Sequence, residues 1–320
     1  MKPLLIVLDD WEGRIQSSSC WANLKDQVDI KFLKGPLEEQ DNEVFPHTQF
    51  LMAIRERTTL NEALFQRMPQ LKLILQTGGH SYHIDAAAAR KRNIIIALGR
   101  RVKAPLMSVP ELTFAFMLSL THKVYLGNSS MQHGKWELFT GCTLSERRLG
   151  ILGLGRHGSR VANIARTAFN MDVVAWDRTG NYQNKQEIQR LTLNELLETS
   201  DVVSIHLKLS KESMGLLDKV RLAKMKKSAI LINTSRGAIV DEDALTDALR
   251  NGNIAGAGLD VFTHEPLPPD SSLRKLDNVV LTPHIGWTVE EVFEEFARIA
   301  CAQLRDYLDG TLADSELLQD

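Results

Sequence analysis

Cysteine is scarce in this chain, which has three cysteines among its 320 residues. Cys20, Cys142 and Cys301 are odd in number, lie far apart in the sequence and lack the Cys-x-x-Cys spacing of zinc or redox motifs. Such a set indicates free thiols in a reducing compartment, because disulfide frameworks belong to oxidising ones. We therefore expect a soluble cytoplasmic protein.

An excess of charge of one sign is also missing, since 38 Lys and Arg residues are balanced by 40 Asp and Glu residues. Nucleic-acid binders usually carry a basic excess or a basic patch. The short basic runs at 89–92 and 224–227 are interpreted as solvated helix ends. This balance argues against a nucleic-acid partner.

Apolar runs long enough to cross a membrane are absent as well. A membrane-spanning helix needs about 20 apolar residues, but the most apolar later stretch, 112–126, is interrupted by Thr, His and Lys. The first residues, MKPLLIVLDD, have only a short apolar core before two acids, which predicts a first β-strand rather than a signal peptide. With 43% apolar residues, the composition is that of a globular protein without a membrane partner.

What the chain does have is an alternation of short apolar runs with helical patterns. One helical pattern, 241–252, has acids in its first turn, apolar residues on one face and an Asn-Gly pair at its end. Apolar strands separated by helices predict parallel sheets that are covered on both faces. The predicted strands are 4–8, 50–54, 71–75, 94–98, 149–155, 172–176, 201–207, 229–233, 255–261 and 278–284.

The chain length predicts two domains. Two prolines and several basic residues interrupt the pattern within 99–113, where we place a boundary. From about 104 to 287 the strands form one set. A final predicted helix, from about Thr288 to Leu308, follows the last strand and is a candidate to return to the first domain.

The motif GLGRHG places Gly153, Gly155 and Gly158 between a predicted strand and a predicted helix. The first glycine permits a tight turn, the second lets the backbone approach a pyrophosphate, and the third lets the helix pack closely on the strand. The next strand is followed by Asp177, whose carboxylate would accept hydrogen bonds from the ribose hydroxyls of NAD and repel the 2′-phosphate of NADP. Arg178 would soften that discrimination, so NADP is the alternative cofactor. A glycine-rich turn without a ligand is the structural alternative.

Two later predicted strands are followed by His284 and Glu265. Ligands of parallel α/β sheets bind at the carboxyl ends of the strands, so these two side chains are candidates to pair there. A carboxylate stabilises a protonated imidazole, which can then act as a general acid. Most single histidines are structural, and His264 is a competing candidate next to the glutamate.

Arg236 follows the predicted strand 229–233. A planar guanidinium suits the bidentate capture of a substrate carboxylate. The structural alternative is a salt bridge to Asp241 or Glu242.

Upstream, Gly78 and Gly79 follow the predicted strand 71–75 and could present backbone N–H groups to an anion. His80 and His83 have H-x-x-H spacing, but the only further candidate ligand is Asp85, which we expect to begin a helix. We therefore predict no metal site.

In this order the motifs resemble those of the D-isomer-specific 2-hydroxyacid dehydrogenases, a family that contains D-lactate dehydrogenases, glyoxylate and hydroxypyruvate reductases and D-3-phosphoglycerate dehydrogenases. The resemblance covers nearly the full chain. It rests on the segments TGG (77–79), GLGRHG (153–158), WD (176–177), NTSRGAIVDEDAL (233–245), GLDVFTHEPLP (258–268) and TPHIGWT (282–288).

The resemblance implies an α/β fold with two Rossmann-like, doubly wound parallel-sheet domains and an active-site cleft between them. It implies a discontinuous substrate-binding domain, 1–103 plus 288–320, and an NAD-binding domain, 104–287. It further implies an NAD-dependent oxidoreductase that interconverts a D-2-hydroxy acid and its 2-oxo acid by hydride transfer. A homodimer is implied too, with a helix from about Pro110 forming much of the interface.

The resemblance also implies the roles of individual residues. His284 would be the catalytic acid–base, Glu265 its partner, and Arg236 the group that binds the substrate carboxylate. Substrate contacts would come from Gly78, Gly79, Arg236 and His284. The implied cofactor contacts are Gly153, Gly155, Arg156, His157, Gly158, Asp177, His206, Thr234, Arg236, Asp260, His284 and Gly286.

Two positions depart from the family pattern. His157 stands where family members usually carry an apolar residue, and Lys208, Leu209 and Ser210 stand where a proline is often found. The chain ends soon after the last predicted helix, so we expect no added regulatory domain. The alternative function is a non-catalytic NAD(H)-sensing scaffold on the same fold, and the motifs do not identify which 2-hydroxy acid is the substrate.

Overall fold

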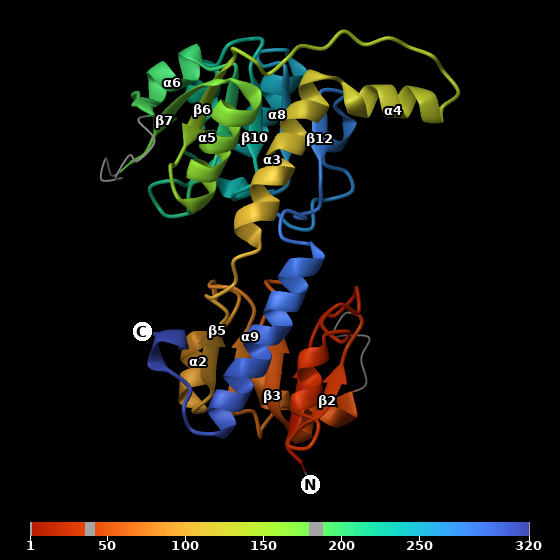
Figure 1. Cartoon of the computed structure of the whole chain (residues 1–320), viewed down its shortest axis with the longest axis vertical. Coiled ribbons are helices and arrows are strands. Elements are labelled where there is room, and N and C mark those ends of the chain that lie inside the picture. Colours follow the sequence, from red (N-terminus) through yellow and green to blue (C-terminus); the bar gives the residue numbers. More distant parts are fainter. Residues whose placement is uncertain (1, 36–41, 179–187, 320) are drawn as a thin grey trace. The chain divides into compact units, whose positions relative to one another are not determined.

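The structure is a computed structural model that describes residues 2–35, 42–178 and 188–319 (Figure 1). The chain divides into two compact units, here called unit 1 (Met1–Ala104 with Thr288–Asp320) and unit 2 (Pro105–Trp287). Each unit contains one parallel sheet covered by helices, which confirms the predicted α/β class. The role of unit 1 in substrate binding stays a prediction.

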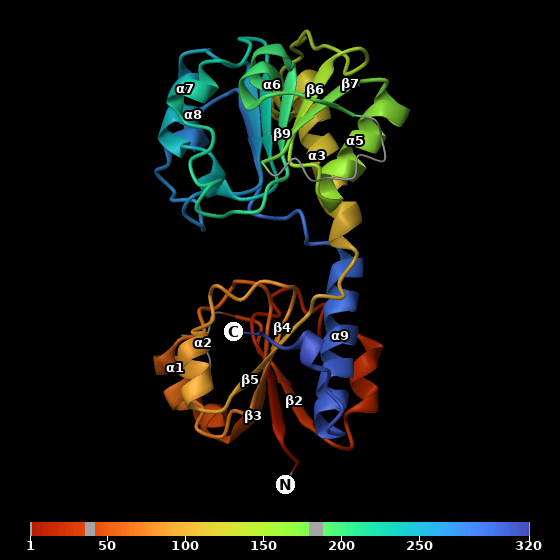
Figure 2. The same cartoon turned by 90° about the vertical axis from the view of Figure 1, so that its left-hand side faces the viewer.

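In unit 1, the strands of the described residues form one five-stranded sheet in the order β2-β1-β3-β4-β5. Figure 2 shows α1 (Glu62–Arg67) and α2 (Ala86–Lys91) on one face and α9 (Glu290–Leu308) on the other. Every strand pair is parallel. The strands are β1 (Leu4–Val7), β2 (Asp29–Phe32), β3 (Thr48–Ala53), β4 (Leu73–Gln76) and β5 (Ile95–Leu98); the short 3-10 helices are η1 (Ser19–Asn23), η3 (Asn42–His47) and η6 (Asp314–Glu316).

In unit 2, the strands of the described residues form one seven-stranded sheet in the order β12-β11-β10-β9-β6-β7-β8. Again all pairs are parallel. The strands are β6 (Arg148–Leu152), β7 (Asp172–Trp176), β8 (Gln189–Arg190), β9 (Val202–Ile205), β10 (Ile230–Asn233), β11 (Gly256–Leu259) and β12 (Val279–Leu281).

Helices cover both faces of this second sheet (Figure 2). One hydrophobic core lies under α3 and α5, and the other lies under α6, α7 and α8. Because both faces are buried, the central strands β9 and β10 are buried along their whole length and are apolar except at Ser204 and Asn233, close to what the sequence indicated. The helices are α3 (Pro105–Thr121), α4 (Val124–Gln132), α5 (Arg156–Phe169), α6 (Leu193–Thr199), α7 (Lys219–Leu222) and α8 (Glu242–Arg250), with 3-10 helices η4 (Gly237–Ile239) and η5 (Ser272–Lys275).

The helix predicted within 241–252 is α8, and its ends follow from local chemistry. The side chain of Asp241 caps the first turn by accepting a hydrogen bond from Ala244 N. Beyond the last turn, Gly252 adopts a positive φ of 65°, a conformation that glycine reaches without steric cost. The apolar residues of α8, such as Leu245 and Leu249, are buried in the core of unit 2.

Two strands, β2 and β8, were absent from the sequence prediction. Both lie at the edge of a sheet, and their residues are only partly buried. An edge strand has one unpaired side, so its sequence needs no continuous apolar run and gives a weak signal. The helix expected from about Pro110 begins earlier, at Pro105, because proline suits the first position of a helix.

The last helix, α9, belongs to unit 1, where it lies against β4 and η1. Within the described residues, none of the helices combines the length and the apolar character that a membrane crossing requires.

Candidate active site

The glycine motif forms the connection between β6 and α5 in unit 2. Gly153 has a positive φ of 97°, and a Cβ atom added to Gly158 would lie 2.0 Å from Gly153 O. Gly155 is the N-cap of α5, with no side chain to cover the first backbone N–H groups of that helix. Such a helix N-terminus binds phosphate groups through those N–H groups and the helix dipole. The loop therefore fits the pyrophosphate of a dinucleotide, as the motif predicted.

Two histidines lie beside this loop. His157 Nε2 is 3.2 Å from Pro105 O, and His206 Nε2 is 2.9 Å from Ser204 Oγ. Burial lowers the pKa of His157. The contact with Pro105 O raises this pKa and the charge of Arg156 lowers it, and the net result is a pKa below the ordinary value. Burial also lowers the pKa of His206, to about 3. Both rings are therefore neutral near pH 7, and His157, the departure from the family pattern, has a hydrogen-bond partner within unit 2.

Asp177 follows β7 and is paired with an arginine that the sequence did not single out. Its Oδ2 atom lies 2.8 Å from Nη1 of Arg190, and only 8% of the Asp177 side chain is exposed. Arg178, the neighbour noted in the sequence, is half-exposed, and its Nη1 atom is 4.0 Å from Glu212 Oε2. Arg190 gave no signal because β8, which carries it, is a two-residue edge strand.

Glu265 and His284 are brought together in unit 2. His284 Nδ1 lies 2.7 Å from Glu265 Oε2, and Phe262 N donates a hydrogen bond of 2.9 Å to Glu265 Oε1. Burial raises the pKa of Glu265, but the hydrogen bond and charge of His284, the Phe262 N–H and the Arg236 charge outweigh it, so this pKa lies below its ordinary value of 4.5. Glu265 is therefore an ionised partner for the imidazole. The competing candidate, His264, is exposed.

The turn that carries His284 is held by Asp260. Thr282 Oγ1 and Ile285 N donate hydrogen bonds of 2.5 and 2.7 Å to Asp260 Oδ1, and Gly286 N donates one of 2.9 Å to Oδ2. Asp260 is 1% exposed, and burial raises its pKa above 3.8 despite these hydrogen bonds and the charge of His284. His284 has a positive φ of 56°, an unusual conformation for a residue other than glycine, which this anchored turn maintains. Sequence reasoning gave Asp260 a cofactor contact and missed its anchoring role.

Arg236 follows β10 and forms no salt bridge within residues 2–35, 42–178 and 188–319. Its Nη1 atom donates a hydrogen bond of 2.7 Å to Ser235 O. The carboxylates of the structural alternative are used elsewhere, since Asp241 caps α8 and Glu242 Oε2 accepts a hydrogen bond from Thr263 N. The salt-bridge interpretation of Arg236 is therefore wrong for this structure. Thr234, two residues earlier, contacts Thr113 through its hydroxyl at 3.1 Å.

In unit 1, the loop with Gly78 and Gly79 follows β4. Gly78 has a φ of 85°, and a Cβ atom there would lie 2.4 Å from Nη1 of Arg55, so the absence of a side chain lets this guanidinium approach the loop. Asp85 is the N-cap of α2, as predicted. No group of three or more candidate ligands that could hold a metal ion occurs among the described residues.

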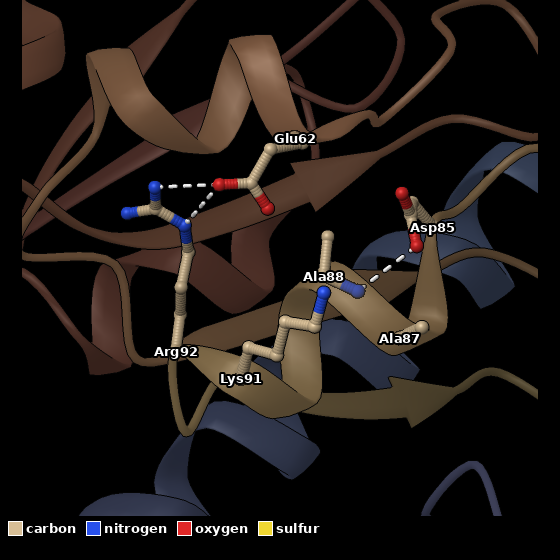
Figure 3. Close-up of a pocket in the computed structure, with 6 residues that line it drawn as sticks. All are labelled: Glu62, Asp85, Ala87, Ala88, Lys91 and Arg92. Atoms are coloured by element: carbon tan, nitrogen blue, oxygen red, sulfur yellow. Dashed lines mark hydrogen bonds and ion pairs between the residues drawn. The ribbon is translucent and has the colours of Figure 1, made fainter.

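A pocket of about 410 Å³ in unit 1 lies away from every predicted site residue (Figure 3). Both of its carboxylates are engaged within the pocket wall, because Arg92 donates hydrogen bonds to Glu62 and the Asp85 side chain accepts one from Ala88 N. It therefore has no group prepared for chemistry. The pocket is lined by Glu62, Asp85, Ala87, Ala88, Lys91 and Arg92.

Comparison with known proteins shows the family of the chain. Residues 114–286 match the family model described as D-isomer specific 2-hydroxyacid dehydrogenase, NAD binding domain. A glyoxylate reductase from Korarchaeum cryptofilum is 34% identical over 269 residues, which are 82% of this chain and 80% of the relative. A D-3-phosphoglycerate dehydrogenase from Bacillus subtilis is 39% identical over 269 residues, but this match covers only 50% of the relative, so the chain spans about half of its length.

A solved structure shows the same fold. The D-lactate dehydrogenase from Aquifex aeolicus, crystallised with NAD and lactic acid, superposes with a TM-score of 0.80 at 26% identity and with 98% of each chain covered.

Proposed function

The chain belongs to the D-isomer-specific 2-hydroxyacid dehydrogenase family, and we propose that it interconverts a D-2-hydroxy acid and its 2-oxo acid with NAD as the cofactor. The observation that supports this proposal most is the contact between His284 and Glu265, with the charge of Arg236 acting on the same carboxylate. A proton donor and a cation in one site are what the reduction of an anionic 2-oxo acid requires.

In the reductive direction, Arg236 binds the substrate carboxylate. His284 uses Nδ1 to contact Glu265, which leaves Nε2 as the atom that gives its proton to the 2-oxo oxygen. Glu265 keeps the imidazole oriented and stabilises its charged form. NAD, when bound as NADH, supplies the hydride. In the oxidative direction His284 takes the proton back.

The cofactor is proposed to bind at the N-terminus of α5. The glycine loop there would hold the pyrophosphate, and Asp177 would accept hydrogen bonds from the adenosine ribose. Asp177 favours NAD over NADP, which is the alternative cofactor. The remaining contacts implied by the family, among them Thr234 and Gly286, stay predictions. So does substrate binding by the Gly78–Gly79 loop of unit 1.

Steady-state turnover with a panel of 2-oxo acids, from glyoxylate and pyruvate to hydroxypyruvate and bulkier acids, tests the proposal. We expect NADH oxidation with at least one acid, and we expect Arg236→Gln to raise KM for that acid while thermal stability is kept. Saturable NADH binding without turnover on any acid would instead favour the NAD(H)-sensing scaffold.

We also propose a homodimer, as the resemblance implies, and we propose that α4 and the segment after it contribute to the interface. Several apolar side chains of α3, such as Phe116 and Met117, are buried in the core of unit 2, although Met107 is 46% exposed. Large apolar residues are also exposed on α4 and the segment that follows it, the yellow and yellow-green part of Figure 1. They include Met131 at 57%, Trp136 at 82% and Leu138 at 90% exposure.

Such a patch of exposed aromatic and aliphatic residues is typical of an interaction surface. Sedimentation equilibrium should give twice the chain mass of 35.9 kDa, and the double variant Trp136→Asp/Leu138→Asp should give the single mass. A wild-type chain that is monomeric at micromolar concentration would contradict the dimer.

A further inference from the structure

We propose that Arg190 is a specificity-determining residue, which neutralises Asp177 and thereby lets the enzyme use NADPH as a second cofactor beside NADH. This inference rests on the proposed function and deepens it. It concerns the end of β7, where the family places the ribose of the cofactor.

The position of Arg190 is built into the sheet. β8 pairs in parallel with β7, with Ala175 opposite Arg190, and Leu191 N donates a hydrogen bond of 3.0 Å to Ala175 O. Asp177 comes two residues after Ala175, and successive side chains of a strand alternate between faces. The register therefore brings the guanidinium to the carboxylate, where Nη1 and Oδ2 lie 2.8 Å apart.

The charge of Asp177 decides which ribose can bind. A lone carboxylate accepts hydrogen bonds from the 2′-hydroxyl of NADH but repels the 2′-phosphate of NADPH. Asp177 is only 8% exposed and Arg190 only 29%, so water screens their interaction weakly. With the guanidinium in place, the local charge is close to zero, and the repulsion that would exclude NADPH is largely removed.

Arg178 supplies a second cation at the same end of β7. Its contact with Glu212 is long, at 4.0 Å, and both side chains are more than half exposed. A contact of this kind contributes little free energy, so Arg178 can turn toward a phosphate at small cost. Arg178 is thus a second cation that can reach a 2′-phosphate at this end of β7.

The competing interpretation is that Arg190 only ties the edge strand to the sheet. A structural tie would change thermal stability and would affect both cofactors equally. Neutralisation of Asp177 instead changes the ratio of kcat/KM with NADPH to kcat/KM with NADH. Unit 2 offers a matched control in a second ion pair, that of Arg148 and Asp172, whose Nε and Oδ2 atoms lie 2.6 Å apart. These two residues begin β6 and β7, at the end of the sheet away from Asp177.

The test uses the full chain and measures Kd for NADH and NADPH by nucleotide fluorescence, kcat/KM with the best 2-oxo acid, and the melting temperature. We expect Arg190→Gln to lower the NADPH-to-NADH ratio about 10- to 100-fold, because the cation that neutralises Asp177 at 2.8 Å is removed and the carboxylate again repels the 2′-phosphate. Arg190→Lys should keep most of the ratio, Arg178→Gln should lower it less, and Arg148→Gln should leave it unchanged.

Equal losses with both cofactors in Arg190→Gln, or an unchanged ratio, would overturn the role of Arg190. So would a wild-type chain that binds NADH but no measurable NADPH. Failure of the wild-type chain to bind either dinucleotide would overturn the proposed function as well, and the two failures are thereby distinguished.

Discussion

Each unit places a histidine close to a side-chain oxygen acceptor, but the acceptors differ. In unit 1, His83 Nε2 lies 3.1 Å from Gln76 Oε1, and burial lowers the pKa of His83. In unit 2, His284 Nδ1 lies 2.7 Å from the carboxylate of Glu265. An amide oxygen carries no full charge, whereas a carboxylate stabilises a protonated imidazole. The same residue type is therefore suited to packing in one unit and to proton transfer in the other.

The two sheets also share a topological feature that they use differently. The direction of winding changes between β1 and β3 in unit 1 and between β6 and β9 in unit 2, and ligands of such sheets bind at these points. In unit 1 the loop that follows β1 is held by its own side chain, since Asp10 accepts hydrogen bonds from Ile15 N and Gln16 N. In unit 2 this point holds the glycine loop and the N-terminus of α5. Both sheets therefore have a point at which ligands of such sheets bind, but the residues that follow the strands decide whether a ligand can bind there.

The histidine comparison predicts the largest effect. His284→Ala should lower kcat about 10²- to 10⁴-fold, the usual contribution of a positioned acid–base. His83→Ala should lower it much less, because a neutral imidazole beside an amide is too weak an acid to protonate a 2-oxo oxygen. Steady-state kinetics with the best 2-oxo acid check both variants, and equal losses in the two would break the comparison.

The glycine loops predict the next effect. In Gly158→Ala the new Cβ would lie 2.0 Å from Gly153 O, so the backbone must shift. Overpacking of this kind costs about 1–3 kcal/mol of folding stability, and because the shift moves the loop proposed to hold the pyrophosphate, NADH binding should weaken as well. In the matched variant of unit 1, Gly79→Ala, the nearest atom would be Arg100 Cγ at 3.6 Å, an ordinary contact.

Fluorescence titration of NADH should therefore separate Gly158→Ala from Gly79→Ala, whose affinity for NADH should stay close to that of the wild type. A Gly158→Ala variant with wild-type affinity would show that the loop does not hold the cofactor.

The buried aspartates predict a smaller effect. In Asp260→Asn the amide NH₂ must face one of three donors, and leaving a buried donor unpaired costs about 1–3 kcal/mol. Because those donors hold the turn of His284, kcat should fall about tenfold together with the melting temperature. Asp10→Asn in unit 1 should lower the melting temperature alone, since Asp10 holds only its own loop. A kcat that stays at the wild-type value in Asp260→Asn would exclude the anchoring role.

The smallest effect concerns the pH dependence of stability. Glu265 has a pKa below 4.5, and so does Glu12 of unit 1. Burial raises the pKa of Glu12, but the hydrogen bond and charge of Arg57 lower it by more. A carboxyl with a depressed pKa contributes stability that is present above its unfolded-state pKa and is lost as the pH falls through its folded-state pKa. Glu265→Gln and Glu12→Gln should therefore each lower the melting temperature above about pH 4.5, with a difference that vanishes in more acidic buffer.

Only Glu265→Gln should also shift the pH profile of kcat/KM, because only Glu265 contacts the proton donor. Melting curves and kinetics over the same pH range test this distinction. Identical rate profiles for wild type and Glu265→Gln would argue against the catalytic pair.

Much of the fold was predictable because its signals are local. The central strands are largely apolar, and the helix at 241–252 carries its own cap and stop residues. The signal of the glycine motif is also local, since its glycines permit the turn after β6 and the close packing of α5 on that turn. Elements with partly exposed residues, such as β2 and β8, escaped prediction because their stability comes from a neighbouring strand and not from their own composition.

By itself, then, the sequence determined the α/β class, the family and the residue types available for proton transfer and anion binding. Only the tertiary structure decided which of them meet. It pairs Asp177 with Arg190, uses Asp260 to hold the turn of His284, and brings Cys20 and Cys301, 281 positions apart, to a Sγ–Sγ distance of 2.6 Å. Such contacts depend on strand order and on the packing of distant helices, and no short window of sequence contains that information.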